Sequence, residues 1–364
     1  MTLAAYARIA KCAGLGQGEA LLDAVATLPG DPVAVADALR AHHLVHLVRA
    51  AVPEPVLRAR LRPEQLQALA SRRPIQRVAP EQLLAAFEEV RDALRPVGVP
   101  VLLLKGLVFA DRLYGGLERR PQFDLDLLVR RRHRRRALRT LASRGFAPKA
   151  RDLHSRTVAR DSLKIDLHHA LRWAPAYRLD EAVLWSGAVE REIRGVAFRT
   201  LSDEYTIVGL VLAGFEDLGQ GMAKLKSLLD LYLLARRIDI AMDWEAFFER
   251  RAGENLLAIS VNVIALVVDL FEARAELPRL AAALATRRGL YTLADREQVY
   301  ALVGAPRKDP ASFAWFRQLY PGSVTLYLLW FWAAGLPANL RDLDLARLRG
   351  TVAVALGRGG PSGG

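Results

Sequence analysis

The segment RPQFDLDLLV, from Arg120 to Val129, decides how the rest of the chain is interpreted. It places Asp124 and Asp126 one residue apart in a short apolar run, just downstream of Arg119 and Arg120. Aspartate is depleted in β-strands, and two nearby carboxylates repel each other unless a cation lies between them. The segment is therefore a solvated edge, an Asx turn, or a strand whose two aspartates hold a metal ion.

In a strand, the two aspartates would act together. Residues i and i+2 of a strand project to the same face, roughly 6.5–7 Å apart. Asp124 and Asp126 then share one face, while Phe123, Leu125 and Leu127 pack into the core. Carboxylates at this spacing converge on one cation or bridge two metal ions about 3.5–4 Å apart. Hard oxygen ligands of this kind suit Mg²⁺.

A third carboxylate, Asp166, lies in a later segment with the same alternation. TVARDSLKIDLHH, residues 157–169, predicts a β-hairpin with Asp161 and Ser162 at the turn. Its second strand carries Lys164, Asp166 and His168 on one face and apolar residues on the other. If this strand lies next to FDLDLLV, the three aspartates form one cluster, and His168 can position one of them.

The segment before the aspartates predicts a phosphate-binding corner. A buried strand is expected at Val99–Leu104, followed by Lys105 and Gly106 and then by a short helix in LVFADRLYGG. Gly106 leaves backbone N–H groups open at a helix start, which favours phosphate binding by this corner. A solvated lysine at a strand end is the alternative.

The pattern along the whole chain predicts an α+β fold. Residues 1–95 show helical periodicity, residues 96–201 contain the expected strands, and residues 202–350 are helical again. The tail, 351–364, is expected to be flexible. The fold class is therefore a small mixed β-sheet flanked by N-terminal and C-terminal helical regions.

Composition indicates a folded protein of the cytoplasm. The chain has 364 residues, of which 52% are hydrophobic and 25% charged. Its single cysteine, Cys12, excludes an intramolecular disulfide and fits a reducing compartment, and no signal sequence opens the chain. The longest apolar runs, Leu256–Val268 and Val324–Pro337, are shorter than the roughly 18–20 residues of a membrane span. We expect no membrane span.

The net charge of +13 suggests acidic partners such as nucleotides, nucleic acid or anionic lipid. Only 7 of the 52 basic residues are lysines. A high-GC coding genome, which favours arginine codons, is therefore a competing explanation for the positive charge. The arginine run 130–136 either grips a polyanion such as RNA or forms a solvated helix start. Both interpretations stay open at this point.

The longer segment VPVLLLKGLVFADRLYGGLERRPQFDLDLLV resembles the core signature of the uncharacterised nucleotidyltransferase family, within the DNA-polymerase-β-like superfamily. LKIDLHHAL resembles the third motif of that family, and KLKSLLDLYLL and DWEAFF resemble its helical C-terminal region. The similarity extends over about residues 30–340. The superfamily's usual Gly-Ser pair is replaced by Lys-Gly, so phosphate contacts are expected from a lysine. The stretch GLVLAGFEDLGQG lacks the histidines found in relatives, which puts any histidine-dependent step there in doubt.

The resemblance implies roles for individual residues. Asp124 and Asp126 would be metal ligands, and Asp166 the third catalytic carboxylate and a metal ligand. Nucleotide phosphates would be bound by four further residues: Lys105, Gly106, Arg120 and Lys226. His168 and Asp230 match further family positions and are candidates for supporting the site from behind these residues.

Some of these residues also have purely structural explanations. Arg120 could be an ion-pair partner of Asp124, with bidentate geometry suiting either that role or phosphate binding. Lys226 and Asp230 are four residues apart and could form a routine helical ion pair.

The implied activity is the transfer of a nucleoside monophosphate from an NTP, with ATP expected, to a hydroxyl acceptor, releasing pyrophosphate. Mg²⁺ or Mn²⁺ would be required, as two ions with the bound NTP. The acceptor is a small molecule, a peptide or protein, or RNA. The alternative is a nucleic-acid-binding protein that keeps the fold with little or no catalysis.

Overall fold

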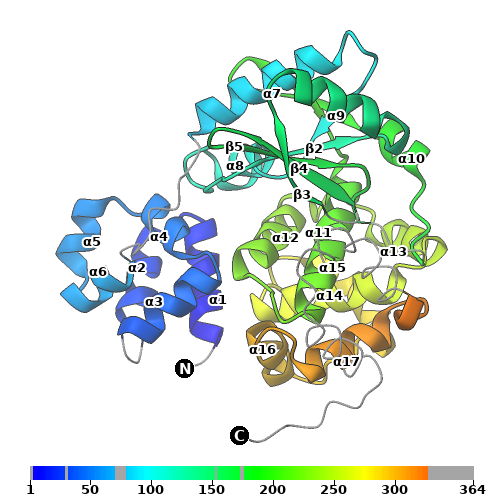
Figure 1. The fold of residues 1–364 in the computed structure, drawn as a ribbon. Coiled ribbons are helices and arrows are strands. Elements are labelled where there is room, and N and C mark those ends of the chain that lie inside the picture. The colour runs from blue at the N-terminus through cyan, green and yellow to red at the C-terminus, as the bar shows by residue number, and fades with distance from the viewer. Residues whose placement is uncertain (1–2, 29–31, 70–78, 152–153, 173–175, 327–364) are drawn as a thin grey trace, which may run out of the picture.

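A computed structural model describes residues 3–28, 32–69, 79–151, 154–172 and 176–326. Figure 1 shows a group of short N-terminal helices beside a sheet-containing layer and a larger helical layer. The N-terminal group consists of α1 (Leu3–Gly14), α2 (Gly18–Ala26), α3 (Pro32–Ala41), α4 (Val45–Ala51), α5 (Glu54–Arg60) and α6 (Pro63–Leu69). The prediction of helices at the start of the chain is confirmed.

The described residues form a mixed five-stranded sheet in the order β1-β2-β5-β4-β3. The strands are β1 (Val101–Leu103), β2 (Leu125–Val129), β3 (Ala147–Arg151), β4 (Ser155–Arg160) and β5 (Leu163–His168). Strands β2 and β5 run parallel, and the remaining neighbours are antiparallel. The β4–β5 pair is the predicted hairpin, with Asp161 at a positive φ of 53° in the turn. The α+β class with a small mixed sheet is therefore confirmed.

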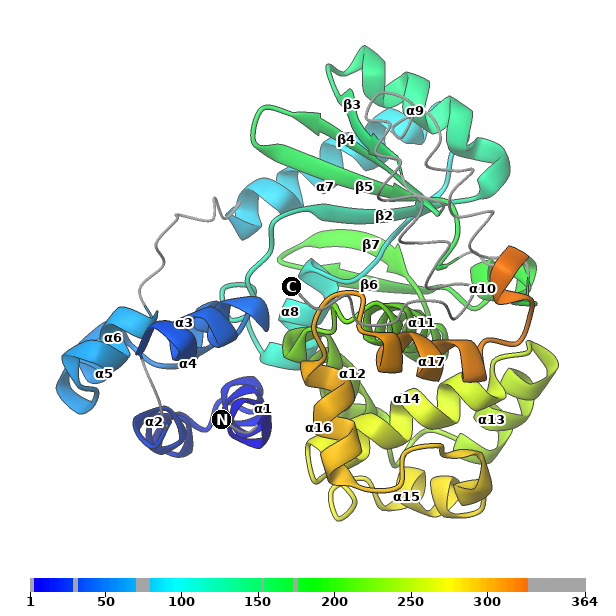
Figure 2. The same cartoon turned by 60° about the horizontal axis from the view of Figure 1, so that its bottom comes forward.

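One face of the sheet is covered by helices and forms an apolar core. Leu125, Leu127 and Val129 of β2 point into this core, as do Ile165 and Leu167 of β5. The covering helices are α7 (Pro80–Leu94), α8 (Leu107–Tyr114) and α9 (Arg134–Ser143). In Figure 2, α7 and α9 lie on the side of the sheet away from α11 and α12. The expected region 1–95 thus ends with one helix, α7, that packs against the sheet.

Strands β3, β6 and β7 were not expected from the sequence. A second hairpin is formed by β6 (Val189–Ile193) and β7 (Val196–Thr200), after the short helix α10 (Glu181–Ser186). Arg194 and Gly195, with φ values of 50° and 83°, make its turn. Phe198 packs edge-on against Phe87 of α7, so the hairpin extends the same core.

The C-terminal helices form the second core, which the N-terminal helices share. They are α11 (Asp203–Gly219), α12 (Leu225–Ile238), α13 (Trp244–Gly253), α14 (Leu257–Leu270), α15 (Pro278–Ala285), α16 (Arg296–Gly304) and α17 (Pro310–Leu319). α1 packs on α12, where a Cβ on Gly14 would lie 3.0 Å from Leu229. The N-terminal and C-terminal helical regions are therefore in contact.

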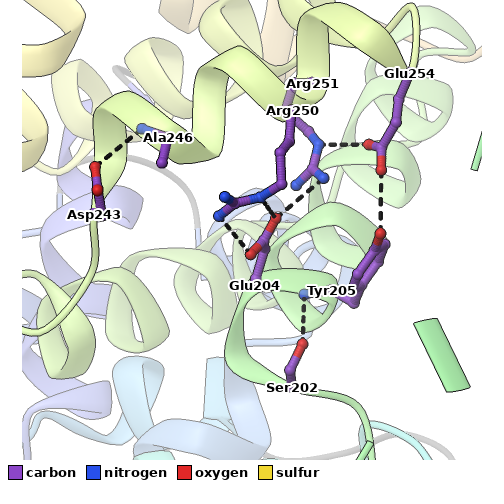
Figure 3. Close-up of polar contacts among 8 residues, drawn as sticks. All are labelled: Ser202, Glu204, Tyr205, Asp243, Ala246, Arg250, Arg251 and Glu254. Atoms are coloured by element: carbon purple, nitrogen blue, oxygen red, sulfur yellow. Dashed lines mark hydrogen bonds and ion pairs between the residues drawn. The ribbon is translucent and has the colours of Figure 1, made fainter. Parts of the chain in front are cut away.

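A buried ion-pair network joins α13 to α11. Arg251 is fully buried, and its Nε donates to Glu254 at 2.6 Å while its Nη2 lies 3.2 Å from Glu204 (Figure 3). Glu254 also accepts a hydrogen bond from the Tyr205 hydroxyl at 3.2 Å. The neighbouring Arg250 pairs with Glu204 at the surface.

The apolar run Leu256–Val268 consists of the N-cap residue of α14 and most of that packed helix. Among the described helices, none has both the length and the hydropathy needed to cross a bilayer. Most of the run Val324–Pro337 and the whole expected tail, 351–364, lie outside the described residues.

Candidate active site

The register of two parallel strands brings two of the predicted carboxylates together. Asp126 of β2 is the direct neighbour of Asp166 of β5. The residues on either side of them belong to the apolar core, so both aspartates point to the opposite face. Asp124 lies directly before β2 rather than within it, and the charges of Asp126 and Asp166 both act on it. The three predicted carboxylates therefore share one region.

Asp126 is the most constrained of the three. It is buried, and its Oδ1 lies 3.1 Å from Lys105 Nζ and 3.0 Å from His168 Nε2. Burial opposes its ionisation, but Lys105 and His168 outweigh burial and lower the pKa of Asp126. The carboxylate is therefore ionised, and His168 holds it from the next strand, as the shared face of the hairpin predicted.

Asp166 is held by a residue that the sequence did not reveal. Thr157 faces it across the β4–β5 ladder and donates a hydrogen bond from Oγ1 to Asp166 Oδ1 at 2.5 Å. One carboxylate oxygen is thereby fixed. Its direction toward the common face is set by the backbone and by this hydroxyl.

Asp124 accepts no side-chain hydrogen bond from any described residue. Burial, followed by the charge of Asp126, raises the pKa of Asp124 to about 6. A half-buried carboxylate without a donor, beside a second carboxylate, is stabilised by an added cation. This is the arrangement expected of a metal ligand.

Lys105 and Gly106 form the predicted corner at the end of β1. The charge of Asp126 raises the pKa of Lys105, so the ammonium group is protonated, while 47% of its side chain stays exposed. Gly106 has a φ of 61° and precedes the first turn of α8. The glycine is needed there because this φ is unfavourable for residues with a Cβ.

Gln122 lies beside this corner and is a candidate site residue that the sequence interpretation missed. Its side chain is buried, and neither its Oε1 nor its Nε2 has a hydrogen-bond partner. Its Oε1 lies 3.4 Å from the position that a Cβ on Gly106 would occupy. A buried amide without partners is costly and indicates a missing ligand. Its place two residues before Asp124 was the only available sequence signal.

Arg120 differs from its expected role. It is buried, and its Nε and Nη2 donate to both oxygens of Asp230 at 3.0 and 2.7 Å. Tyr114 donates to Asp230 as well, at 2.8 Å. The geometry does not support the expected phosphate contact or the pairing with Asp124, because the Arg120 guanidinium already pairs with Asp230. This ion pair joins the segment before β2 to α12. Asp230 supports the site through this pair.

Lys226 lies near the carboxylates but makes no ion pair within 4 Å among the described residues. The alternative of a helical pair with Asp230 is therefore not what forms. Burial, then the charge of Arg120, lowers the pKa of Lys226 to about 7. Its backbone N–H contacts the carbonyl of His42 at 3.4 Å, so the N-terminal helices border the site.

The donor set fits hard divalent cations in its chemistry. Asp124, Asp126 and Asp166 offer carboxylate oxygens only, and Asp124 accepts no hydrogen bond from a side chain within the described ranges. In the described part of the chain, no three acidic, histidine or cysteine side chains are already arranged around one point. Instead, the Lys105 ammonium group lies 3.1 Å from Asp126. Its positive charge neutralises this carboxylate, as a bound metal ion would.

Comparison with known proteins supports membership of one family. The family model described as uncharacterised nucleotidyltransferase matches residues 29–272. Among curated proteins, no significant match was found. A solution structure of the antibiotic-resistance factor ANT(2'')-Ia matches with a TM-score of 0.36 and 17% identity, covering 58% of this chain and 100% of that chain. A similarity this low says nothing about the substrate.

Proposed function

Because the chain belongs to the uncharacterised nucleotidyltransferase family, we propose that it moves a nucleoside monophosphate from an NTP to a hydroxyl acceptor and releases pyrophosphate. ATP is the proposed donor, and the acceptor is a small molecule, a peptide or protein, or RNA. The observation that carries the proposal is the pairing of Asp126 with Asp166 on adjacent parallel strands, with Asp124 beside them.

Asp124, Asp126 and Asp166 are the proposed ligands of two Mg²⁺ or Mn²⁺ ions bound together with the NTP. Such ions neutralise charge on the triphosphate and lower the pKa of an attacking hydroxyl group. His168 and Thr157 orient the aspartates through the bonds described above. Asp166 keeps one oxygen away from Thr157, so it can also accept the proton of the acceptor hydroxyl.

Lys105, Gly106 and Gln122 are the proposed phosphate-binding group. The Lys105 side chain is half exposed and unbranched, so its ammonium group can turn from Asp126 to a phosphate oxygen. The positive φ of Gly106 opens the first N–H groups of α8 to the same phosphate. Lys226 adds a positive charge from α12.

The proposal is tested by incubating the protein with each labelled NTP, Mg²⁺ or Mn²⁺, and fractionated cell extract. We expect label in one acceptor fraction, and a loss of at least about 100-fold in Asp126→Asn or Asp166→Asn. Asp161→Asn is the matched control, because this exposed aspartate lies in the turn of the same hairpin and the change removes the same charge.

Two outcomes contradict the proposal. One is full labelling by the Asp126→Asn and Asp166→Asn variants. The other is an absence of labelling together with nucleic-acid binding that weakens steeply with salt and is unchanged in Asp124→Asn, which favours a binding protein without catalysis.

A further inference from the structure

We propose that a cluster of three arginines, at the other end of α8 from the Lys105–Gly106 corner, is a binding site for a phosphate group. The arginine cluster consists of Arg112, Arg191 and Arg237. Arg112 and Arg191 face Asp203, while Arg237 contacts the backbone of Arg112 and its charge acts on Arg191. Arg112 is in the last turn of α8, whose first turn lies at the Lys105–Gly106 corner. The cluster therefore lies at the opposite end of this helix from the proposed active site.

Four elements distant in sequence bring the cluster together. Arg112 comes from α8, Arg191 from β6, Arg237 from the last turn of α12, and Asp203 from the first turn of α11. α12 packs against both α8 and α11, and Figure 2 shows β6 beside α8 and α11. Arg237 Nη1 donates to the backbone carbonyl of Arg112 at 3.1 Å, which fixes the two arginines side by side.

The charges of the cluster are not balanced. Among the described residues, Asp203 is the single carboxylate within 4 Å of Arg112 or Arg191, and Arg237 has no carboxylate within that distance. Arg112 Nη2 lies 2.7 Å from Asp203 Oδ1, and Arg191 Nη2 lies 3.9 Å from the same oxygen. Guanidinium groups remain charged at any physiological pH, so the excess positive charge cannot be removed by deprotonation. An anion removes the mutual repulsion.

Two buried hydrogen-bond donors of the cluster are also unused. The Nε atoms of Arg112 and Arg191 are buried and have no hydrogen-bond partner. Asp203 Oδ1 has none either, because its close approach to Arg112 lacks hydrogen-bonding geometry. The carboxylate thus offsets part of the charge without satisfying the donors. Buried donors of this kind point to a missing acceptor.

The missing acceptor fits a phosphate group best. Guanidinium groups present forked donors that match the oxygens of phosphate in pairs. The three guanidinium groups come from three different elements, so they require an acceptor whose oxygens point in several directions. A tetrahedral phosphate has such oxygens, and a planar carboxylate lacks them. A bound phosphate would tie the sheet-containing layer, through α8 and β6, to helices α11 and α12.

The test measures the melting temperature of the full chain in EDTA during titration with inorganic phosphate, with sodium chloride at matched ionic strength. We expect phosphate to stabilise the wild type, and its affinity to fall at least about tenfold in Arg191→Gln and Arg237→Gln. Arg236→Gln is the matched control, because this neighbour on α12 pairs with Glu276 instead. It is expected to respond like the wild type.

A Lys105→Ala variant separates this site from the proposed active site. Stabilisation by phosphate that persists in this variant supports the arginine cluster, whatever the outcome of the transferase assay. Equal stabilisation of all variants, or its loss in Lys105→Ala alone, would overturn the inference. A parallel titration with glycerol phosphate distinguishes free phosphate from a phosphate monoester. The compound that raises the melting temperature at the lower concentration is the preferred ligand.

Discussion

At the scale of single residues, Gln122 gives the sharpest prediction. We expect Gln122→Leu to raise the KM for the NTP about tenfold, because the amide loses its ligand contact. The free energy of unfolding should stay constant or rise by about 1–3 kcal/mol, since a buried amide without partners is removed. Kinetics of label transfer and urea unfolding measure the two effects. Gln318→Leu, at an exposed position, is the control.

A different result for Gln122 would assign it a structural role. An unchanged KM together with a lower free energy of unfolding in Gln122→Leu would mean that the side chain only fills space beside Gly106. A ligand-binding role raises KM without lowering the free energy of unfolding, and a space-filling role does the reverse. The two roles can therefore be distinguished whatever the absolute activity is.

His169 gives a prediction for the effect of pH on stability. Burial, together with the nearby Arg134, Arg156 and Arg131, lowers the pKa of His169 to about 4. The unfolded state, with a pKa of about 6.5, therefore binds a proton first. The contribution of the neutral His169 side chain to the free energy of unfolding is therefore complete above pH 6.5 and is lost as the pH falls toward 4. The wild type should lose about 1.4 kcal/mol per pH unit more than His169→Leu in this interval. Parallel curves of unfolding free energy would contradict this assignment.

The sequence predicted the positions of the candidate site residues only where local patterns determine them. The alternation in LKIDLHH placed Asp166 and His168 on one face, and the register with β2 confirmed their approach to Asp126. The partner of Arg120 could not be predicted, because Asp230 lies 110 residues away and on a helix. Thr157 was equally hidden, since its contact depends on the pairing of β4 with β5.

At the scale of elements, the network between α11 and α13 in Figure 3 predicts a large loss of stability on mutation. Glu254→Ala should lower the free energy of unfolding by about 3–5 kcal/mol, because Arg251 is left buried with one carboxylate fewer. Arg250→Gln, which affects only an exposed pair with Glu204, should cost about 1 kcal/mol or less. Similar losses in the two variants, measured by denaturant unfolding, would argue against a buried network.

The elements themselves were predicted unevenly. The hairpin β4–β5 and helix α8 with its terminating Gly115 have clear turn signals, and both are present. β6 and β7 were missed because Arg191 lies on the inward side of β6, between Val189 and Ile193, and so breaks the apolar alternation; the Arg194–Gly195 turn was the remaining signal. Helix α7 looked like its N-terminal neighbours because periodicity shows that a helix has an apolar face but not what that face packs against.

At the scale of the whole molecule, the Arg120–Asp230 pair joins the entry to β2 with α12 and so links the two layers that border the proposed site. Either single change, Arg120→Leu or Asp230→Leu, should lower the free energy of unfolding by about 3–5 kcal/mol, because each leaves a buried charge unpaired. The double variant should lose much less than the sum, since both charges are gone. Arg296→Leu, in an exposed pair with Glu272, is the control. Additive losses in the double variant would show that the two residues act separately, and the layers would then be held together by the apolar contacts of α8 and α12 alone.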